Sequence, residues 1–74
     1  TLEERCDLIA RRFGLTRREE EICLYLASGD TLSSIGQKLF IADSTMKTHS
    51  RHIYRKIGVE NKQDLQAFVA SYRR

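Results

Sequence analysis

Apolar residues recur along the chain at steps of three and four positions, which is the repeat of an α-helix that buries one of its sides. Each such segment is bounded by residues that favour a helix end. The predicted helices span about 2–13, 17–28, 32–39 and 43–57, and a last helix starts after Asn61. Proline is absent and glycine is rare. We therefore expect an all-α fold, a small bundle of four to five helices.

Polar residues at the segment boundaries predict where these helices begin. Thr16, followed by Glu19, is a capping box, in which the hydroxyl accepts the third helical N–H and the carboxylate reaches back. Thr31 and Asn61 stand at the same position before the third and last helices. Gly36 lies inside the third helix, where it is less favourable than Ala by about 1 kcal/mol. We therefore expect another backbone to approach Gly36 closely.

The segment 43–57 has two different sides. At about 100° per residue, the basic residues Lys47, Arg51 and Arg55 gather opposite an inward stripe. The inward stripe is formed by Met46, Ser50, Ile53 and Ile57. Residues 43–58 carry four basic groups and one acidic group, a net +3, whereas residues 1–28 carry five and six, a net −1. A concentrated basic segment is typical of a phosphate-binding surface, although a bare run of charge is more often only a solvated face.

The third and fourth predicted helices are joined by three residues, 40–42. Two short helices with a tight connection, of which the second has a basic outer side, form the plan of a helix-turn-helix. In that plan the helix over 32–39 lies across the sugar-phosphate backbone, and the helix over 43–57 enters the major groove, which is about 12 Å wide. Taken alone, this pattern only suggests DNA binding.

Length and composition narrow the class of protein. The chain has 74 residues and a net charge of +3, which fits one folded domain. Its longest apolar run, 22–27, is far short of the roughly 20 residues that span a bilayer, and its acidic start is unlike a secretory signal. Cys6 and Cys23 do not make a disulfide framework, so we interpret them as small apolar residues in a reducing compartment. We expect a cytoplasmic protein, of which this chain is a piece.

Other chemistries find little support. Cys6, Cys23, His49 and His52 lack the tight pair of cysteines that a zinc site needs. The chain also has no glycine-rich phosphate loop, no nucleophile elbow and no paired carboxylates. We therefore expect no metal, no cofactor and no enzyme activity.

Several ordered motifs go beyond periodicity. The chain reads Leu15-Thr16-Arg17-Arg18-Glu19-Glu20-Glu21-Ile22, then Leu26-Ala27-Ser28-Gly29-Asp30-Thr31, then Thr45-Met46-Lys47-Thr48-His49, and finally Ile53-Tyr54-Arg55-Lys56-Ile57-Gly58-Val59. These runs resemble LTxRExEV, LAxGx(S/T), TVKxH and IYxKLGV, which are motifs of the LuxR-type (GerE-like) helix-turn-helix domain of bacterial response regulators and quorum-sensing activators. The resemblance covers about 50 of the 74 residues without gaps.

The resemblance implies a sequence-specific DNA-binding domain of a transcription regulator over 15–74, preceded by a docking helix over 1–14. It places base contacts on Lys47, Thr48 and Arg51. Phosphate contacts are expected from Ser44, Thr45, Arg55 and Lys56, although Thr45 could instead cap its own helix. It also implies a weak homodimer through the last helix, with an interface of Gln63, Ala67, Ala70 and Ser71, and an additional contact with RNA polymerase.

Four positions depart from the family pattern around the turn. Gly36 replaces a usual Ala, Ser34 a usual Glu, Met46 a usual Val and Ala42 a usual capping Ser. Each change should loosen the turn. Because Ala42 has no capping group, Asp43 is the nearest residue able to cap, which would move the helix start by one residue.

A helical protein-interaction module is the alternative from another class. It would dock on a regulatory partner or on RNA polymerase without reading DNA. An apolar or acidic outer side on the helix over 43–57 would favour that alternative. Lys47, Arg51 and Arg55 favour DNA.

Overall fold

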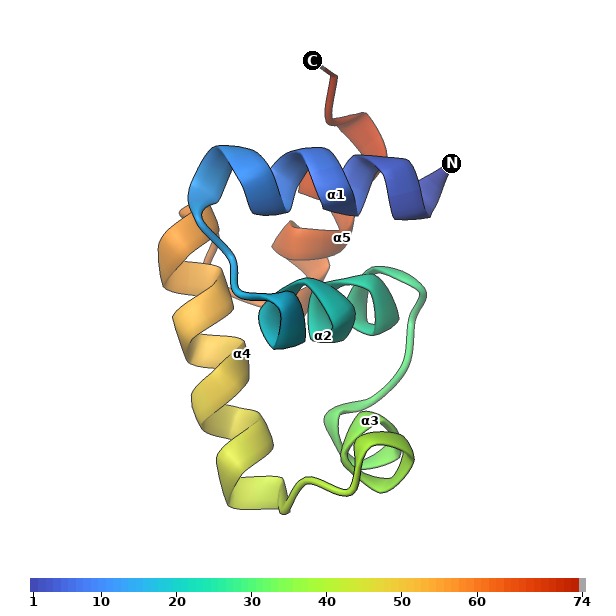
Figure 1. Ribbon diagram of the computed structural model, residues 1–74, viewed down its shortest axis with the longest axis vertical. Helices are drawn as coiled ribbons and strands as arrows, with labels where there is room; N and C mark the ends of the chain where they lie inside the picture. The colour runs from blue at the N-terminus through green and yellow to red at the C-terminus, as the bar shows by residue number, and fades with distance from the viewer. Residues whose placement is uncertain (74) are drawn as a thin grey trace.

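A computed structural model describes residues 1–73, and all regular structure in this part is α-helical. The helices are α1 (Leu2–Phe13), α2 (Arg17–Ala27), α3 (Leu32–Leu39), α4 (Asp43–Ile57) and α5 (Lys62–Ser71). In Figure 1, α1 and α2 lie one above the other with α5 beside them, α4 runs down one side, and α3 lies at the far end. The expected all-α bundle is confirmed, and the predicted helix bounds agree to within one residue.

Local capping explains why the helices begin where they do. Thr16 and Glu19 form both hydrogen bonds of the predicted capping box. The Thr31 hydroxyl accepts the Ser34 N–H, and the Asn61 side chain accepts the Asp64 N–H, so these two caps are single. The four orphan N–H groups of a helix start are therefore partly satisfied by side chains close in sequence, which is why the boundaries were predictable.

One core holds all five helices together. The segment 1–14 is part of it, because α1 buries Cys6 and Ile9. The remaining core residues are Ile22, Cys23, Leu26, Ile35, Met46, Ile53, Ile57, Leu65 and Val69. Both cysteines are free and buried, as expected of small apolar residues. No helix within residues 1–73 has the length and apolar character needed to cross a membrane.

An aromatic cluster joins the two ends of the chain. The rings of Phe13 and Phe68 meet edge to face with centroids 5.7 Å apart, and Tyr72 lies 5.4 Å from Phe68 and 6.4 Å from Phe13. Such geometries are favourable for aromatic quadrupoles. The cluster therefore packs the end of α1 against α5.

The connection between α3 and α4 is tight because Gly36 has no side chain. A Cβ at this position would lie 2.6 Å from the carbonyl oxygen of Ile41 and 3.2 Å from Cγ of Met46. The Ile41 N–H donates to the Gly36 carbonyl at 2.8 Å. The expected close approach of another backbone is confirmed, and it leaves no room here for the methyl group of Ala.

The start of α4 differs from one expectation. The helix begins at Asp43, and Ala42 is the N-cap without any side-chain hydrogen bond. Neither Asp43 nor Thr45 caps the helix, so the expected shift of its start is wrong. One carboxylate oxygen of Asp43 lies 3.8 Å from where a Cβ of Gly36 would stand, so this side chain lies toward α3.

We predict that Gly36→Ala destabilises the domain although Ala favours helix. Overpacking against a backbone carbonyl costs about 1–3 kcal/mol, and the gain in helix propensity offsets about 1 kcal/mol. The melting temperature should fall by several degrees, since about 1 kcal/mol shifts it by roughly 4–8 °C at this size. The exposed neighbour Gln37, changed to Ala, is the matched control and should stay within about 0.5 kcal/mol. A higher melting temperature for Gly36→Ala would contradict the close approach.

Candidate nucleic-acid interface

The inner side of α4 is held in the core along its whole length. Met46, Ser50, Ile53 and Ile57 are buried, as the periodicity predicted. The buried Ser50 hydroxyl donates to the Lys47 carbonyl at 2.8 Å, so its polar group is satisfied inside the helix. Gly58, with φ of 90°, ends the helix in the left-handed conformation. This packing fixes which side of α4 faces outward.

The outer side of α4 is basic and free of ion pairs. Lys47, Arg51 and Arg55 are exposed, and none of them forms an ion pair with another residue of the described 1–73. Ser44 and Thr48 are exposed on the same helix. The Thr48 hydroxyl donates to the Ser44 carbonyl at 3.2 Å, which occupies its one hydrogen. Uncompensated charge on a rigid helix attracts phosphate.

Lys56 occupies a different place from the other cations of α4. Its ammonium lies 2.7 Å from Oε1 of Glu19 and 3.1 Å from the carbonyl oxygen of Gly14. At about 100° per residue, Lys56 stands roughly 80° from the buried stripe, whereas Arg55 stands about opposite to it. The helical angle therefore indicates that Lys56 lies nearer the buried side than Arg55, but it does not identify α2 as its neighbour. Its role in joining α4 to α2 was missed, and its phosphate contact stays a prediction.

Glu19 is the buried partner in this ion pair. Its side chain is only 6% exposed, against 36% for Lys56. Burial raises the pKa of Glu19, but the hydrogen bonds from Lys56 and from the Thr16 N–H, with the charge of Lys56, outweigh burial and lower the pKa below its usual value. One carboxylate therefore serves both as the capping group of α2 and as the anchor of α4.

Lys38, on α3, is also engaged within the fold. Its ammonium lies 2.6 Å from a carboxylate oxygen of Asp30 and 5.0 Å from the ring centroid of Tyr25. Hydrogen bonding to Asp30 raises the pKa of Lys38. Because Lys38 and Lys56 are paired, the unpaired cations of the helix-turn-helix lie on the outer side of α4.

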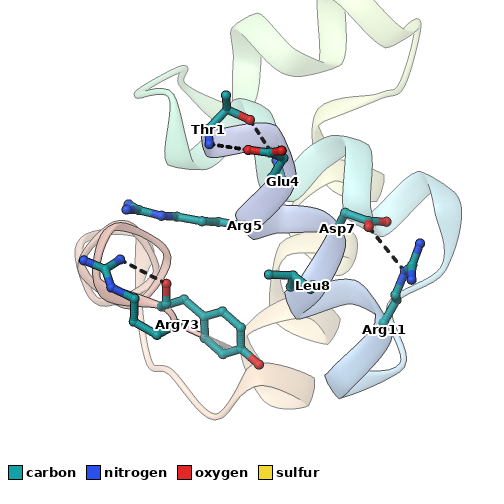
Figure 2. A pocket seen from close by; sticks show the side chains of 8 residues that line it. Thr1, Glu4, Arg5, Asp7, Leu8, Arg11 and Arg73 are labelled. Carbon is teal, nitrogen blue, oxygen red and sulfur yellow. Dashed lines mark hydrogen bonds and ion pairs between the residues drawn. The ribbon is translucent and has the colours of Figure 1, made fainter.

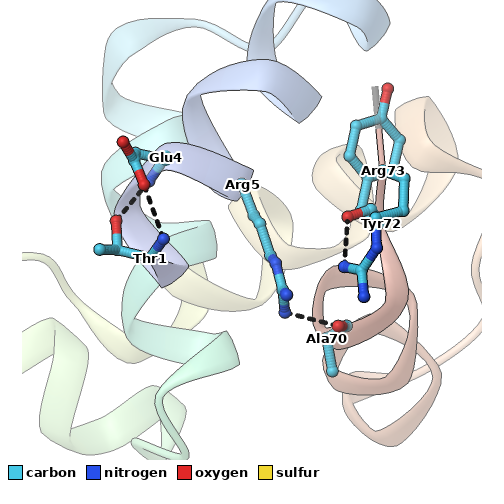
Figure 3. A network of polar contacts seen from close by, with 6 residues as sticks. All are labelled: Thr1, Glu4, Arg5, Ala70, Tyr72 and Arg73. Atoms are coloured by element: carbon cyan, nitrogen blue, oxygen red, sulfur yellow. Dashed lines mark hydrogen bonds and ion pairs between the residues drawn. The ribbon is translucent and has the colours of Figure 1, made fainter.

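The predicted dimer residues lie on the outer side of α5. Leu65 and Val69 are buried beneath that side. The four outward residues are Gln63, Ala67, Ala70 and Ser71, and all are exposed. Arg5 of α1 donates a hydrogen bond to the carbonyl of Ala70, so α1 braces the last turn of α5 (Figure 3).

A shallow groove lies between α1 and the end of α5 (Figure 2). It is lined by Thr1, Glu4, Arg5, Asp7, Leu8, Arg11, Tyr72 and Arg73. Asp7 and Arg11 pair across one turn of α1 at 3.3 Å, and both are largely solvated. Because the groove is open and mostly charged, it lacks the enclosed apolar walls of a small-molecule site.

The fold and this basic helix together define a class, the helix-turn-helix DNA-binding domains of transcription regulators. Within that class, the chain belongs to the luxR family of bacterial regulatory proteins, whose pattern matches residues 14–69. The family resemblance seen in the sequence is thereby confirmed. The match begins directly after α1, so the whole of α1 lies outside the family pattern.

Curated relatives are transcription regulators of greater length. The chain is 42% identical over 59 residues to the transcriptional regulatory protein LiaR of Bacillus subtilis, covering 80% of this chain and 27% of that protein. It is 38% identical over 48 residues to the probable transcriptional regulatory protein NarL of Mycobacterium tuberculosis, covering 65% of this chain and 22% of that protein. The chain thus spans about a quarter of the length of these relatives. No solved structure matches it significantly.

We predict that Lys56→Met destabilises the domain at pH 7 by about 1–3 kcal/mol, because the buried Glu19 carboxylate loses its partner. The pKa of Glu19 is lowered in the fold, so its stabilisation is present above the unfolded pKa of about 4.3 and is lost as pH falls through the folded pKa. Urea unfolding at neutral and acidic pH should therefore show that the difference in the free energy of unfolding between wild type and variant becomes smaller as pH falls below about 4.3.

Arg55→Met is the matched control for this prediction. It removes an exposed charge from the adjacent position of α4 and should change stability by no more than about 0.5 kcal/mol at either pH. If wild type and Lys56→Met differ in the free energy of unfolding by as much in acid as at neutral pH, the role given to Glu19 is contradicted.

Proposed function

We propose that this domain binds duplex DNA sequence-specifically by placing α4 in the major groove, and that it regulates transcription in this way. The single observation that carries the proposal is the outer side of α4. Its three cations have no ion-pair partner within residues 1–73, while its inner side is buried. The major groove of DNA, about 12 Å wide, admits one helix with its side chains. The domain acts through binding, and we assign it no catalytic step.

Base contacts are proposed for Lys47, Thr48 and Arg51. At about 100° per residue these side chains leave α4 within an arc of roughly 100°, so they can face one groove floor together. Lys and Arg donate to O6 and N7 of guanine, and the Thr methyl can contact a thymine methyl. The Thr48 hydroxyl donates its hydrogen to the Ser44 carbonyl, so the methyl and the acceptor lone pairs of the hydroxyl remain for a base.

Phosphate contacts are proposed for Ser44, Thr45, Arg55 and Lys56. Ser44 and Thr45 lie in the first turn of α4, which has no side-chain cap, so its N–H groups are available to an anion. Arg55 is exposed and unpaired. The Lys56 ammonium has three donors, of which Glu19 and Gly14 take two, so one remains for phosphate. We expect Arg55 to contribute more than Lys56.

A weak homodimer through α5 is proposed on the exposed small residues of that helix. Ala67 and Ala70 let two such helices approach closely, and a two-fold axis would place half-sites about one DNA turn, 10–10.5 base pairs, apart.

The longer relatives are described as transcriptional regulators. We extend that role to the protein that contains this domain, acting in the cytoplasm, and we propose RNA polymerase as a second contact of a regulator bound beside a promoter.

We predict that DNA binding weakens steeply with salt. If about four to six phosphates are neutralised per domain, the slope of log affinity against log salt is roughly −3.6 to −5.4. Fluorescence anisotropy with a duplex recovered by selection from random-sequence DNA measures it. An affinity insensitive to salt, or no recovered duplex, would favour a protein-interaction module instead.

We predict different effects for two neighbouring arginines of α4. Arg51→Ala should reduce the discrimination between selected and scrambled duplexes, because one good base contact is worth about 1–3 kcal/mol. Arg55→Ala should weaken both duplexes equally and make the salt slope shallower by about 1. The two variants control for each other, since both remove one exposed arginine from the same helix. Equal losses on both duplexes for Arg51→Ala would move base recognition to other residues.

We predict that Ala67→Glu impairs cooperative binding to a two-site duplex but leaves affinity for one half-site nearly unchanged. The change places like charges across a two-fold interface on α5. The comparison variant is Ser33→Glu, which adds the same charge at an exposed position of α3. Ser33→Glu lies near the proposed DNA surface and should weaken half-site binding instead. Cooperativity that survives Ala67→Glu would place the dimer surface elsewhere.

A further inference from the structure

Phe40 combines two features that the fold does not need. It has φ of 58° and ψ of 46°, which makes it the one residue other than glycine with positive φ among residues 1–73. It is also the one large hydrophobic side chain that is exposed in this part of the chain, at 96%. The left-handed conformation disfavours a side chain with a Cβ, and a fully exposed aromatic ring gains nothing from burial.

The turn requires the left-handed backbone conformation of Phe40, but it does not require an aromatic side chain there. The Phe40 and Ile41 N–H groups both donate to the Gly36 carbonyl, which ends α3 in a left-handed cap. Gly or Asn meets this requirement with less strain. No aromatic or cation contact within residues 1–73 involves the Phe40 ring. A residue that is unfavourable at its own position and unused by the fold points to an external contact.

The place of Phe40 indicates which contact. Phe40 lies three positions before Asp43, the first residue of α4, so their Cα atoms lie at most about 11 Å apart. That limit is smaller than the major-groove width of about 12 Å. Figure 1 places the α3–α4 connection and the first half of α4 at the same end of the molecule, away from α1 and α5. With the start of α4 in the groove, Phe40 is therefore within reach of the strand that borders it.

We infer that the Phe40 ring packs against deoxyribose of the DNA strand that borders the groove occupied by α4. The inference rests on the proposed function. Deoxyribose is the apolar part of the DNA backbone, and it stands between the phosphates that Ser44 and Thr45 are proposed to contact. A second copy of the chain is disfavoured as the occupant, because α5, the helix proposed to form the dimer, lies away from the α3–α4 connection (Figure 1).

The test compares Phe40→Asn with Phe40→Tyr in the 74-residue chain. Asn accepts the left-handed conformation, so Phe40→Asn should keep the melting temperature of the wild type or raise it. Its affinity for one half-site of a selected duplex should fall about three- to tenfold, from the loss of part of an aromatic burial. Its salt slope should equal that of the wild type, since no phosphate contact is removed. Phe40→Tyr keeps the ring and should bind close to the wild type.

The outcomes separate this inference from the proposed function. If the wild type binds DNA and Phe40→Asn binds it equally well, the deoxyribose contact is overturned and the proposed function stands. If Phe40→Asn keeps its half-site affinity but loses cooperativity on two sites, the deoxyribose contact is also overturned, because the ring would then contact a second copy of the chain. Wild type that binds no duplex overturns both. A shallower salt slope for Phe40→Asn would show that the variant disturbs phosphate contacts and would contradict an apolar role.

Discussion

The helix α4 has to be buried along one side and left bare along the other, and the remaining helices serve this requirement. Two anchors hold it. At its start, Gly36 allows the Ile41 backbone to approach α3, while Met46 enters the core. At its end, Lys56 pairs with the buried Glu19, which itself caps α2. Because the anchors lie near opposite ends, the direction of the basic side is set by the fold and not by α4 alone.

This arrangement separates stability from recognition. Two of the cations that hold elements together, Lys38 and Lys56, have carboxylate partners. Lys47, Arg51 and Arg55 have none within residues 1–73, and their replacement leaves no buried charge behind. Surface substitutions of this kind change stability by only about 0.5 kcal/mol. Substitutions on the outer side of α4 should therefore leave the fold intact.

Sequence reasoning succeeded where the determinants are local. The Thr16–Glu19 capping box and the stripe of α4 depend on residues within one or two helical turns, so helix bounds and the outward side of α4 could be predicted. The partner of Lys56 lies 37 residues away, and no local pattern encodes it. The conformation of Phe40 likewise depends on how Gly36 and Ile41 meet across the turn. The uncapped Ala42 was visible in the sequence, but where Asp43 would lie was not.

The most direct test of the central claim is a map of backbone amide chemical shifts while a selected duplex is added to the ¹⁵N-labelled domain. Burial of the α4 outer side in the groove predicts the largest changes at Lys47, Thr48 and Arg51 and in the turn before α4. Asp7 and Arg11, on the outer side of α1, should hardly change. Largest changes along α1 and α5, with α4 unaffected, would contradict the account.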